Sequence, residues 1–230
     1  MAMISFRNVY RYYDDWPALE DVSFEVEEGE FVVVSGPSGA GKTTIIRLIW
    51  MGDLPSRGTV EVAGFRSDSA LRGGRLPTLR HKLGIVFQDF RLLPERNIYR
   101  NVALPLEVSG TSSRAVRKRV FNLLADMGLS HRRFSLPHEL SGGEQQRVAI
   151  ARAMVAHPVV LLADEPTGNL DPEVSRHVVS LLVEINRSGT TVVIATHDPR
   201  QIPPGVARFL FLDAGRIVTP GRRGAGKAPR

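Results

Sequence analysis

A glycine-rich loop near the start of the chain carries the residues best suited to bind a chain of phosphates. The run Gly36-Pro37-Ser38-Gly39-Ala40-Gly41-Lys42-Thr43 follows the apolar stretch 31–34 and precedes a helical pattern that begins at Thr44. Glycines let backbone N–H groups converge on an anion, the lysine reaches the β- and γ-phosphates, and the final hydroxyl can ligate Mg²⁺. The helix N-terminus adds its dipole. These residues, including Thr44, predict a nucleotide phosphate site.

The same glycine and lysine spacing recurs near the end of the chain, at 221–227. There, Ala228 stands where the first copy has the Thr43 hydroxyl, and too little chain follows to form a helix. We therefore expect no ligand at the second copy. Residues 219–230 contain four basic residues and no acid, and we expect them to form a basic, flexible tail.

Two adjacent carboxylates, Asp164 and Glu165, follow the continuous apolar run 159–163. Such a run is typical of a buried strand in a parallel sheet. Successive side chains of a strand point in different directions, so one carboxylate can hold Mg²⁺ while the other polarises the water that attacks the γ-phosphate. We assign Asp164 to the metal, together with Thr43, and Glu165 to the water.

Two further polar residues follow apolar runs in the same way. His197 follows 191–195 and Gln88 follows 83–87. Ligands of α/β sheets gather at the carboxyl ends of the strands. We expect His197 to contact the γ-phosphate and Gln88 to reach the metal or the water through its amide oxygen. With Lys42 and Glu165, they complete the predicted catalytic set.

A second anion cradle is predicted at Ser141-Gly142-Gly143-Glu144, directly before a helical pattern. A serine and two glycines at a helix start expose backbone N–H groups and the positive end of the helix dipole. The physical pattern alone is equally typical of a capped helix that binds nothing.

Strand patterns alternate with helical ones along most of the chain. Apolar alternation or continuous apolar runs predict strands at 4–6, 22–26, 31–34, 59–62 (as an edge strand), 83–87, 159–163, 191–195, 209–212 and 216–218. The polar and aromatic stretch 10–17 predicts an exposed loop. Helical periodicity predicts helices from Thr44 and over 115–124, 144–156 and 174–186.

This order predicts an α/β fold with a P-loop core, a mainly parallel sheet and an antiparallel β subdomain at the N-terminus. We expect one domain over 1–218, with its core at 1–88 and 159–218. The α-helical segment 89–158 is predicted to be an insertion into that core.

The composition is typical of a folded domain without disulfides or membrane-spanning helices. The 230 residues are 43% hydrophobic and include no cysteine, which suits a folded domain without disulfides or thiolate metal sites. The net charge of +6 falls to +2 without the tail. No apolar run approaches the roughly 18 residues of a membrane helix, and the first residues lack a signal-peptide pattern. We therefore expect a cytoplasmic protein.

Taken together and in this order, these motifs closely resemble those of an ABC-type ATPase. The resemblance extends from Ile4 to Val218. It implies ATP and Mg²⁺ as ligands and a head-to-tail homodimer, in which Ser141 to Glu144 of one copy close over ATP held by the phosphate loop of the other. It also implies that Tyr13 stacks on adenine, although Tyr10 and Tyr12 are close enough to compete. Asn169 to Asp171 resemble the loop that communicates between the two sites.

Within that family, the run 87–94 and the run 101–106 resemble the FtsE family of bacterial cell-division ATPases. That resemblance implies an integral membrane partner, FtsX, and a peripheral location on the cytoplasmic face of the bacterial plasma membrane. ATP-driven closure would then control cell-wall (peptidoglycan) hydrolases. The apolar residues after Gln88 are candidates for docking the partner, and some of them must also be core.

Three alternatives compete with this interpretation. A lipoprotein-releasing or macrolide-type exporter ATPase would share the chemistry and differ in its membrane partner. A nucleic-acid-associated ABC ATPase would need long coiled coils or tandem cassettes, which do not fit in 230 residues, so no nucleic-acid partner is expected. An ATP-gated clamp without turnover is disfavoured by Glu165.

Overall fold

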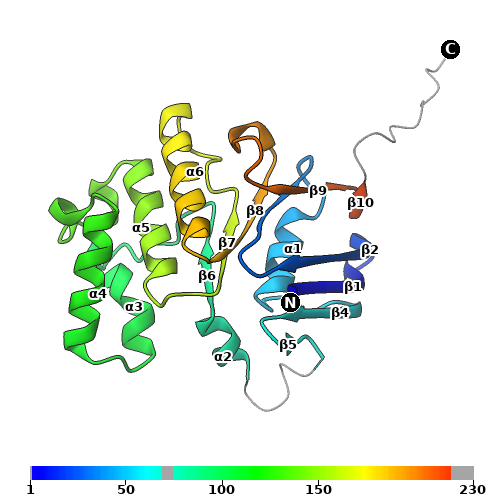
Figure 1. The fold of residues 1–230 in the computed structure, drawn as a ribbon, viewed down its shortest axis with the longest axis horizontal. Helices are drawn as coiled ribbons and strands as arrows, with labels where there is room; N and C mark the ends of the chain where they lie inside the picture. Colours follow the sequence, from blue (N-terminus) through cyan, green and yellow to red (C-terminus); the bar gives the residue numbers. More distant parts are fainter. Residues whose placement is uncertain (1, 69–74, 219–230) are drawn as a thin grey trace.

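The computed structural model describes residues 2–68 and 75–218; the predicted tail and its second glycine-rich copy lie outside these ranges. Two sheets and the helices packed on them make up the described structure (Figure 1). The strands are β1 (Ala2–Tyr13), β2 (Trp16–Glu27), β3 (Phe31–Ser35), β4 (Arg57–Val62), β5 (Phe65–Arg66), β6 (Leu83–Val86), β7 (Val160–Asp164), β8 (Thr191–Thr196), β9 (Arg208–Asp213) and β10 (Arg216–Val218). The α-helices are α1 (Lys42–Ile49), α2 (Leu76–His81), α3 (Ile98–Val108), α4 (Ser113–Asp126), α5 (Gly142–Met154) and α6 (Pro172–Arg187).

The six-stranded sheet has the order β10-β9-β3-β8-β7-β6. Its strands run parallel from β9 to β6, and β10 pairs antiparallel with β9. The carboxyl ends of β3, β6, β7 and β8 therefore lie along one edge. The four segments predicted to carry chemistry begin at this edge, which confirms the α/β class and its mainly parallel sheet.

The apolar runs of the central strands face two different cores. On β7, Leu161 and Ala163 pack with α3 to α6, whereas Val160 and Leu162 pack with α1 and the antiparallel sheet. The strands are buried on both faces, which is why their sequences are continuous rather than alternating. Helix α1 thus lies between the two sheets (Figure 1), and its position is fixed from both sides.

The antiparallel sheet has the order β2-β1-β4-β5. The predicted loop at 10–17 is wrong, because β1 continues to Tyr13 and β2 begins at Trp16, leaving a tight turn at Asp14 with φ of 51°. Tyrosine and tryptophan favour strands, and the polar residues between them obscured that preference. Residues 59–62 are not an edge strand either, since β4 lies between β1 and β5.

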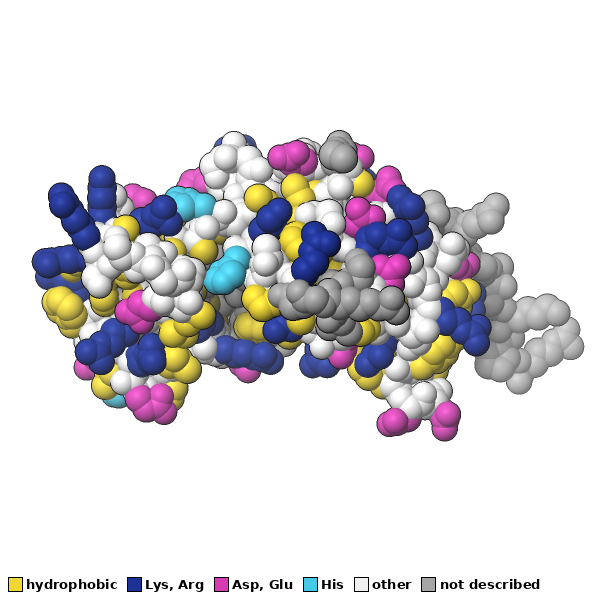
Figure 2. Space-filling view, turned by 90° about the horizontal axis from the view of Figure 1, so that it is seen from below, with side chains coloured by type: hydrophobic (Ala, Val, Ile, Leu, Met, Phe, Trp, Pro, Cys, Tyr) yellow, Lys and Arg dark blue, Asp and Glu magenta, His cyan; other side chains and the backbone are white. Residues whose placement is uncertain are grey.

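The segment predicted to be helical, 89–158, contains α3, α4 and α5. Helix α5 begins two residues before the predicted start and α6 likewise begins at Pro172. The short elements β5 and α2 were not predicted, because two and six residues are too few to show a period. The basic residues of α4 are exposed, in keeping with a solvated face, and Figure 2 shows Lys and Arg side chains at the end of the molecule that α3 and α4 form.

Within the two described ranges, no helix combines the length and the apolar character that crossing a membrane requires.

Candidate functional site

The loop between β3 and α1 has a backbone that only glycine can supply at two positions. A Cβ on Gly36 would lie 2.1 Å from the carbonyl oxygen of Leu212, so the loop passes directly against β9. Gly41 has φ of 104°, and a Cβ there would lie 2.5 Å from the carbonyl oxygen of Ala18. These contacts hold the start of α1 against both sheets and leave the loop's backbone open on its outer side.

The remaining loop residues divide between the surface and the core. Pro37, Ser38 and Gly39 are exposed at the tip, and Ala40 and Thr44 are buried beneath it. A loop anchored at its base with an open tip suits anion binding through backbone N–H groups.

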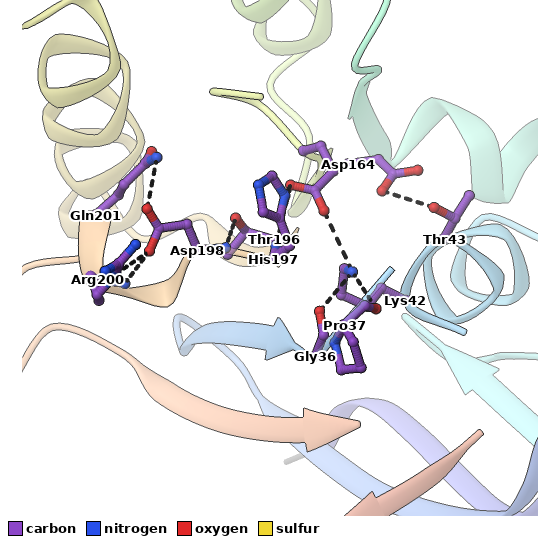
Figure 3. A network of polar contacts seen from close by, with 11 residues as sticks. Gly36, Pro37, Lys42, Thr43, Asp164, Thr196, His197, Asp198, Arg200 and Gln201 are labelled. Atoms are coloured by element: carbon purple, nitrogen blue, oxygen red, sulfur yellow. Dashed lines mark hydrogen bonds and ion pairs between the residues drawn. The ribbon is translucent and has the colours of Figure 1, made fainter. Parts of the chain in front are cut away.

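Lys42 lies across the loop rather than pointing into solvent (Figure 3). Its Nζ donates hydrogen bonds to the carbonyl oxygens of Gly36 at 2.9 Å and Pro37 at 3.0 Å. The same ammonium lies 3.5 Å from Oε1 of Glu165. The side chain is only 7% exposed, so the loop, the lysine and the carboxylate form one compact charged cluster.

Thr43 and Asp164 lie side by side, as predicted for two metal ligands (Figure 3). The threonine hydroxyl donates to Oδ1 of Asp164 at 3.2 Å. Burial raises the pKa of the Asp164 carboxyl; the nearby Glu165 charge adds to the rise, while the Thr43 hydrogen bond and Lys42 oppose it. A cation beside the carboxylate would offset that cost.

The donor set fits Mg²⁺. Its protein sites use one or two carboxylates with substrate phosphates and water, rather than a cage of side chains. The Thr43 hydroxyl beside the Asp164 carboxylate provides two oxygen ligands of this kind. Within the described residues, no group of three or more His, Asp or Glu side chains is arranged to hold a metal ion.

Glu165 connects Lys42 to His197. Oε2 of Glu165 lies 2.9 Å from Nδ1 of His197 and accepts from the His197 backbone N–H at 3.3 Å. Glu165 has φ of 47°, and its backbone N–H donates to the carbonyl oxygen of Ala195 at 2.8 Å. This left-handed backbone carries the carboxylate away from the direction of β7 and toward the end of β8.

Gln88 lies beside the turn that follows Glu165. A Cβ placed on Gly168 would lie 3.5 Å from Nε2 of Gln88 and 3.6 Å from Cβ of Glu165. The amide and the Glu165 side chain therefore both lie beside Gly168. The structure brings together the phosphate loop, Asp164, Glu165, His197 and Gln88.

Ser141 to Glu144 form a separate group at the N-terminus of α5. The Ser141 hydroxyl accepts from the Glu144 backbone N–H at 3.3 Å, and Oε2 of Glu144 accepts from the Ser141 backbone N–H at 2.9 Å. The latter bond lowers the pKa of Glu144 most, and a hydrogen bond from Arg132 contributes. This is a capping box that satisfies two of the helix's own N–H groups.

The cradle at α5 is far from the phosphate loop of the same chain, because α6 and the parallel sheet lie between α5 and α1 (Figure 1). Instead it packs against the start of α6. A Cβ on Gly143 would lie 2.5 Å from Val174, and one on Gly142 would lie 3.4 Å from Leu170. The contacts of Leu170 and Val174 were missed from the sequence, where Leu170 belongs to the predicted loop 169–171 and Val174 looks like an ordinary apolar helix residue.

Tyr13 occupies the end of β1 and is partly exposed. Its hydroxyl donates to Asp53, and the Arg11 guanidinium lies 4.5 Å from its ring centroid. Tyr10 and Tyr12 stack on each other with centroids 6.5 Å apart. Any base that stacks on Tyr13 would use the ring face opposite Arg11.

Comparison with known proteins gives a consistent family. The family model described as "ABC transporter" matches residues 19–168, which is more than half of the chain. The cell division ATP-binding protein FtsE of Mycobacterium tuberculosis is 49% identical over 224 residues, covering 96% of this chain and 97% of that protein. FtsE of Escherichia coli K12 is 44% identical over 216 residues, covering 94% and 97%.

A solved structure has nearly the same fold. It is a dimeric, post-hydrolysis state of the ATP-binding cassette MJ0796 bound to ADP and Pi. The TM-score is 0.85 and the identity 35%, with 94% of this chain and 96% of that one covered.

Proposed function

Because the chain belongs to the ABC transporter family and is one of its ATPases, we propose that it is an FtsE-type subunit that couples ATP-driven dimer closure to an FtsX-like membrane protein in cell division. Control of peptidoglycan hydrolases would be the output. The FtsE relatives support this because they match over nearly the whole length of both chains. The protein would lie peripherally on the cytoplasmic face of the bacterial plasma membrane, held there by its partner.

ATP binding begins with an exchange of partners at Lys42. In the structure this ammonium is satisfied by two loop carbonyls and by Glu165. The β- and γ-phosphate oxygens would replace them, while the N–H groups of Gly39 to Thr43 bind the phosphates from the other side. Tyr13 would stack on the adenine.

The same exchange prepares Glu165 as the general base. Once Lys42 turns to the phosphates, Oε1 of Glu165 can accept a proton from the attacking water. Oε2 remains held by His197, which fixes the carboxylate's direction. Because the ionised Glu165 carboxylate only accepts, Nδ1 of His197 carries a proton. Nε2 has no hydrogen-bond partner among the residues that the structure describes, so the imidazole donates to the γ-phosphate from Nε2 when both ring nitrogens are protonated.

Thr43, Asp164 and Gln88 would hold Mg²⁺. When bound, this ion neutralises charge on the β- and γ-phosphate oxygens. The hydroxyl and carboxylate are already adjacent, and Gln88 lies beside Gly168, in the turn that follows Glu165.

A second copy of the chain would complete the site. Ser141, Gly142, Gly143 and Glu144 begin α5, which packs in the core on the opposite face of the parallel sheet from α1, so we expect them not to cover the ATP of their own chain. Ser141 and Gly142 are exposed, so the N-terminus of α5 can approach the γ-phosphate held by another copy. The core at 1–88 and 159–218 would bind nucleotide, and the helical part at 89–158 would close over it and contact the membrane partner.

The observation that carries the catalytic part is the single network joining Lys42, Glu165 and His197 beside the Thr43 and Asp164 pair. The test of the cellular role is purification of the full tagged chain from detergent-solubilised membranes, followed by identification of bound proteins. We expect an FtsX-like protein with four membrane spans. Recovery of a lipoprotein-releasing or macrolide-type exporter instead would replace this proposal with the exporter alternative.

A further inference from the structure

The segment between β6 and α3 contains two consecutive residues with left-handed backbone. Phe90 has φ of 55° and Arg91 has φ of 47°. Residues other than Gly, Asn and Asp rarely adopt this backbone conformation. It persists only where surrounding contacts enforce it. The pair follows Gln88 by two residues, so its conformation directly affects where that amide lies.

Arg152, on α5, supplies the enforcing contacts. Its Nη1 donates to the carbonyl oxygen of Arg91 at 2.5 Å and its Nη2 donates to that of Phe90 at 2.7 Å. One guanidinium thus bridges both strained peptides. Burial lowers the pKa of Arg152, but the guanidinium keeps its charge in a protein, so these are charge-assisted hydrogen bonds.

Other contacts tie the segment to its own neighbourhood. Asn101, at the start of α3 and fully buried, binds both the N–H and the carbonyl of Leu93. The Arg91 guanidinium pairs with Asp89 and lies 4.0 Å from the Phe87 ring centroid. These anchors are local in sequence, whereas Arg152 connects the segment to a helix about 60 residues away.

Helix α5 carries a second functional group at its other end. Ser141 caps its N-terminus and Arg152 lies eleven residues later, in its last turn. An α-helix rises about 1.5 Å per residue, which separates the two by roughly 16 Å along a rigid rod. If the Ser141 end of α5 moves and the helix moves as a rigid body, Arg152 moves with it, and so do its hydrogen bonds to the carbonyls of Phe90 and Arg91.

Arg152 also has room to move. It borders a hollow of about 220 Å³ whose other walls include Leu83, Ile85 and Pro105. Arg152 is therefore not enclosed on every side by its neighbours on β6 and α3.

We propose that Arg152 is a positioning residue, which couples the Ser141 end of α5 to Gln88 through the left-handed pair Phe90 and Arg91. Closure of a second copy on Ser141 would move α5, and Arg152 would carry that movement to the segment beside the γ-phosphate. The proposal rests on the proposed function for the roles of Ser141 and Gln88. Its structural part, that Arg152 holds the strained pair, stands independently.

The first test is Arg152→Lys in the full chain. Lysine keeps the charge but is a point donor, which does not reproduce the planar fork that bridges two carbonyls. We expect kcat for ATP hydrolysis to fall at least tenfold while KM for ATP stays within twofold. The matched control is Arg176→Lys, at an exposed arginine of α6, which we expect to leave both constants unchanged.

A second substitution separates positioning from simple loss of packing. Glycine adopts left-handed backbone without a Cβ penalty, and alanine does not. In the Arg152→Lys background, Arg91→Gly should recover at least threefold in kcat, whereas Arg91→Ala, which removes the same side chain, should recover nothing. Equal kcat values for the two double variants would overturn the proposal.

Hydrogen exchange of the nucleotide-free protein gives a readout that does not depend on activity. Arg152→Lys should raise exchange of the 90–96 amides at least tenfold and leave the α1 amides unchanged, with Arg176→Lys as control. Unchanged exchange at 90–96 would refute the holding role of Arg152. A failure of the proposed function would instead show as a missing membrane partner or as full activity of Glu165→Gln, neither of which alters this result.

Discussion

The two regions proposed to bind phosphate differ in the partners of their polar groups. At the phosphate loop, Lys42, Glu165 and His197 come from three separate segments and contact one another. At the start of α5, Ser141 and Glu144 bind each other's backbone N–H, three residues apart, and Glu144 also pairs with the nearby Arg132. The first region is assembled by the tertiary fold, and the second is a local helix cap with an open face.

This difference is the basis for the proposal that one chain holds only part of the catalytic site. Parallel strands deliver the loop, the carboxylates and the histidine to one edge because their carboxyl ends coincide. Nothing in that arrangement brings α5 to the same edge. The cap is stable without a ligand, so its two N–H contacts can be kept while a phosphate approaches from another copy.

Glu165→Gln should have the largest effect, because it removes the proposed base from the assembled region while preserving the shape of the side chain. We expect kcat to fall about 10³-fold, within the range for loss of a general base. ATP binding should persist, and the complex should accumulate as a dimer. Phosphate release and gel filtration measure the two effects, and hydrolysis at the original rate would remove the catalytic assignment.

Lys42→Ala should weaken the same region at the binding step. Loss of charge-assisted hydrogen bonds to phosphate is worth about 1.5–3 kcal/mol, or roughly 10–150-fold in Kd. Titration calorimetry with ATP and Mg²⁺ measures this directly. An unchanged Kd would contradict the position assigned to the phosphates.

Ser141→Arg probes the other region. A long cationic side chain at the cap should block closure and weaken ATP-dependent dimerisation at least tenfold, while the ATP affinity of the monomer stays the same. The expected loss of stability is about 1 kcal/mol, as for other N-cap substitutions.

Ser112→Arg is the matched control for that variant. Ser112 is the N-cap residue of α4, outside the cradle, and its side chain makes no capping hydrogen bond. We expect its dimerisation to equal that of the unmodified chain. An ATP-dependent Ser141→Arg dimer of normal affinity would count against the shared site.

Glu144→Gln should give the smallest effect and a pH dependence. The Ser141 backbone N–H, aided by Arg132, holds the pKa of Glu144 below its ordinary value. Its carboxylate therefore contributes stability above the pKa of the unfolded state, and that contribution is lost as pH falls through the folded-state pKa. The substitution should lower the free energy of unfolding by less than about 1 kcal/mol near pH 7, and by still less near pH 4.

Thermal unfolding of Glu144→Gln at both pH values checks this, with Glu184→Gln on α6 as a control for removing one carboxylate. A larger loss of stability at the lower pH would show that the capping box does not favour the ionised form.

The sequence predicted the assembled region better than its surroundings. Gly36 to Thr43, Asp164 and His197 were placed correctly at one sheet edge because each follows an apolar run, and parallel strands align such ends. The contact of Lys42 with Glu165 depends on side-chain directions that a linear pattern does not contain.

Other features were hidden for different physical reasons. Tyr13 belongs to a strand, although polar neighbours made it resemble a loop. Arg152 looks like an ordinary charged position on a helix, since its partners are backbone carbonyls of a distant segment. The capping box, by contrast, is local, and the spacing of Ser141 and Glu144 predicts it directly.

The most direct test of the shared site is a structure of Glu165→Gln with ATP and Mg²⁺. We predict two copies, with each triphosphate against the amides around Lys42 of one copy and facing Ser141 of the other. A triphosphate bound elsewhere, or a bound loop whose ATP is not approached by a second copy's α5, would contradict the account.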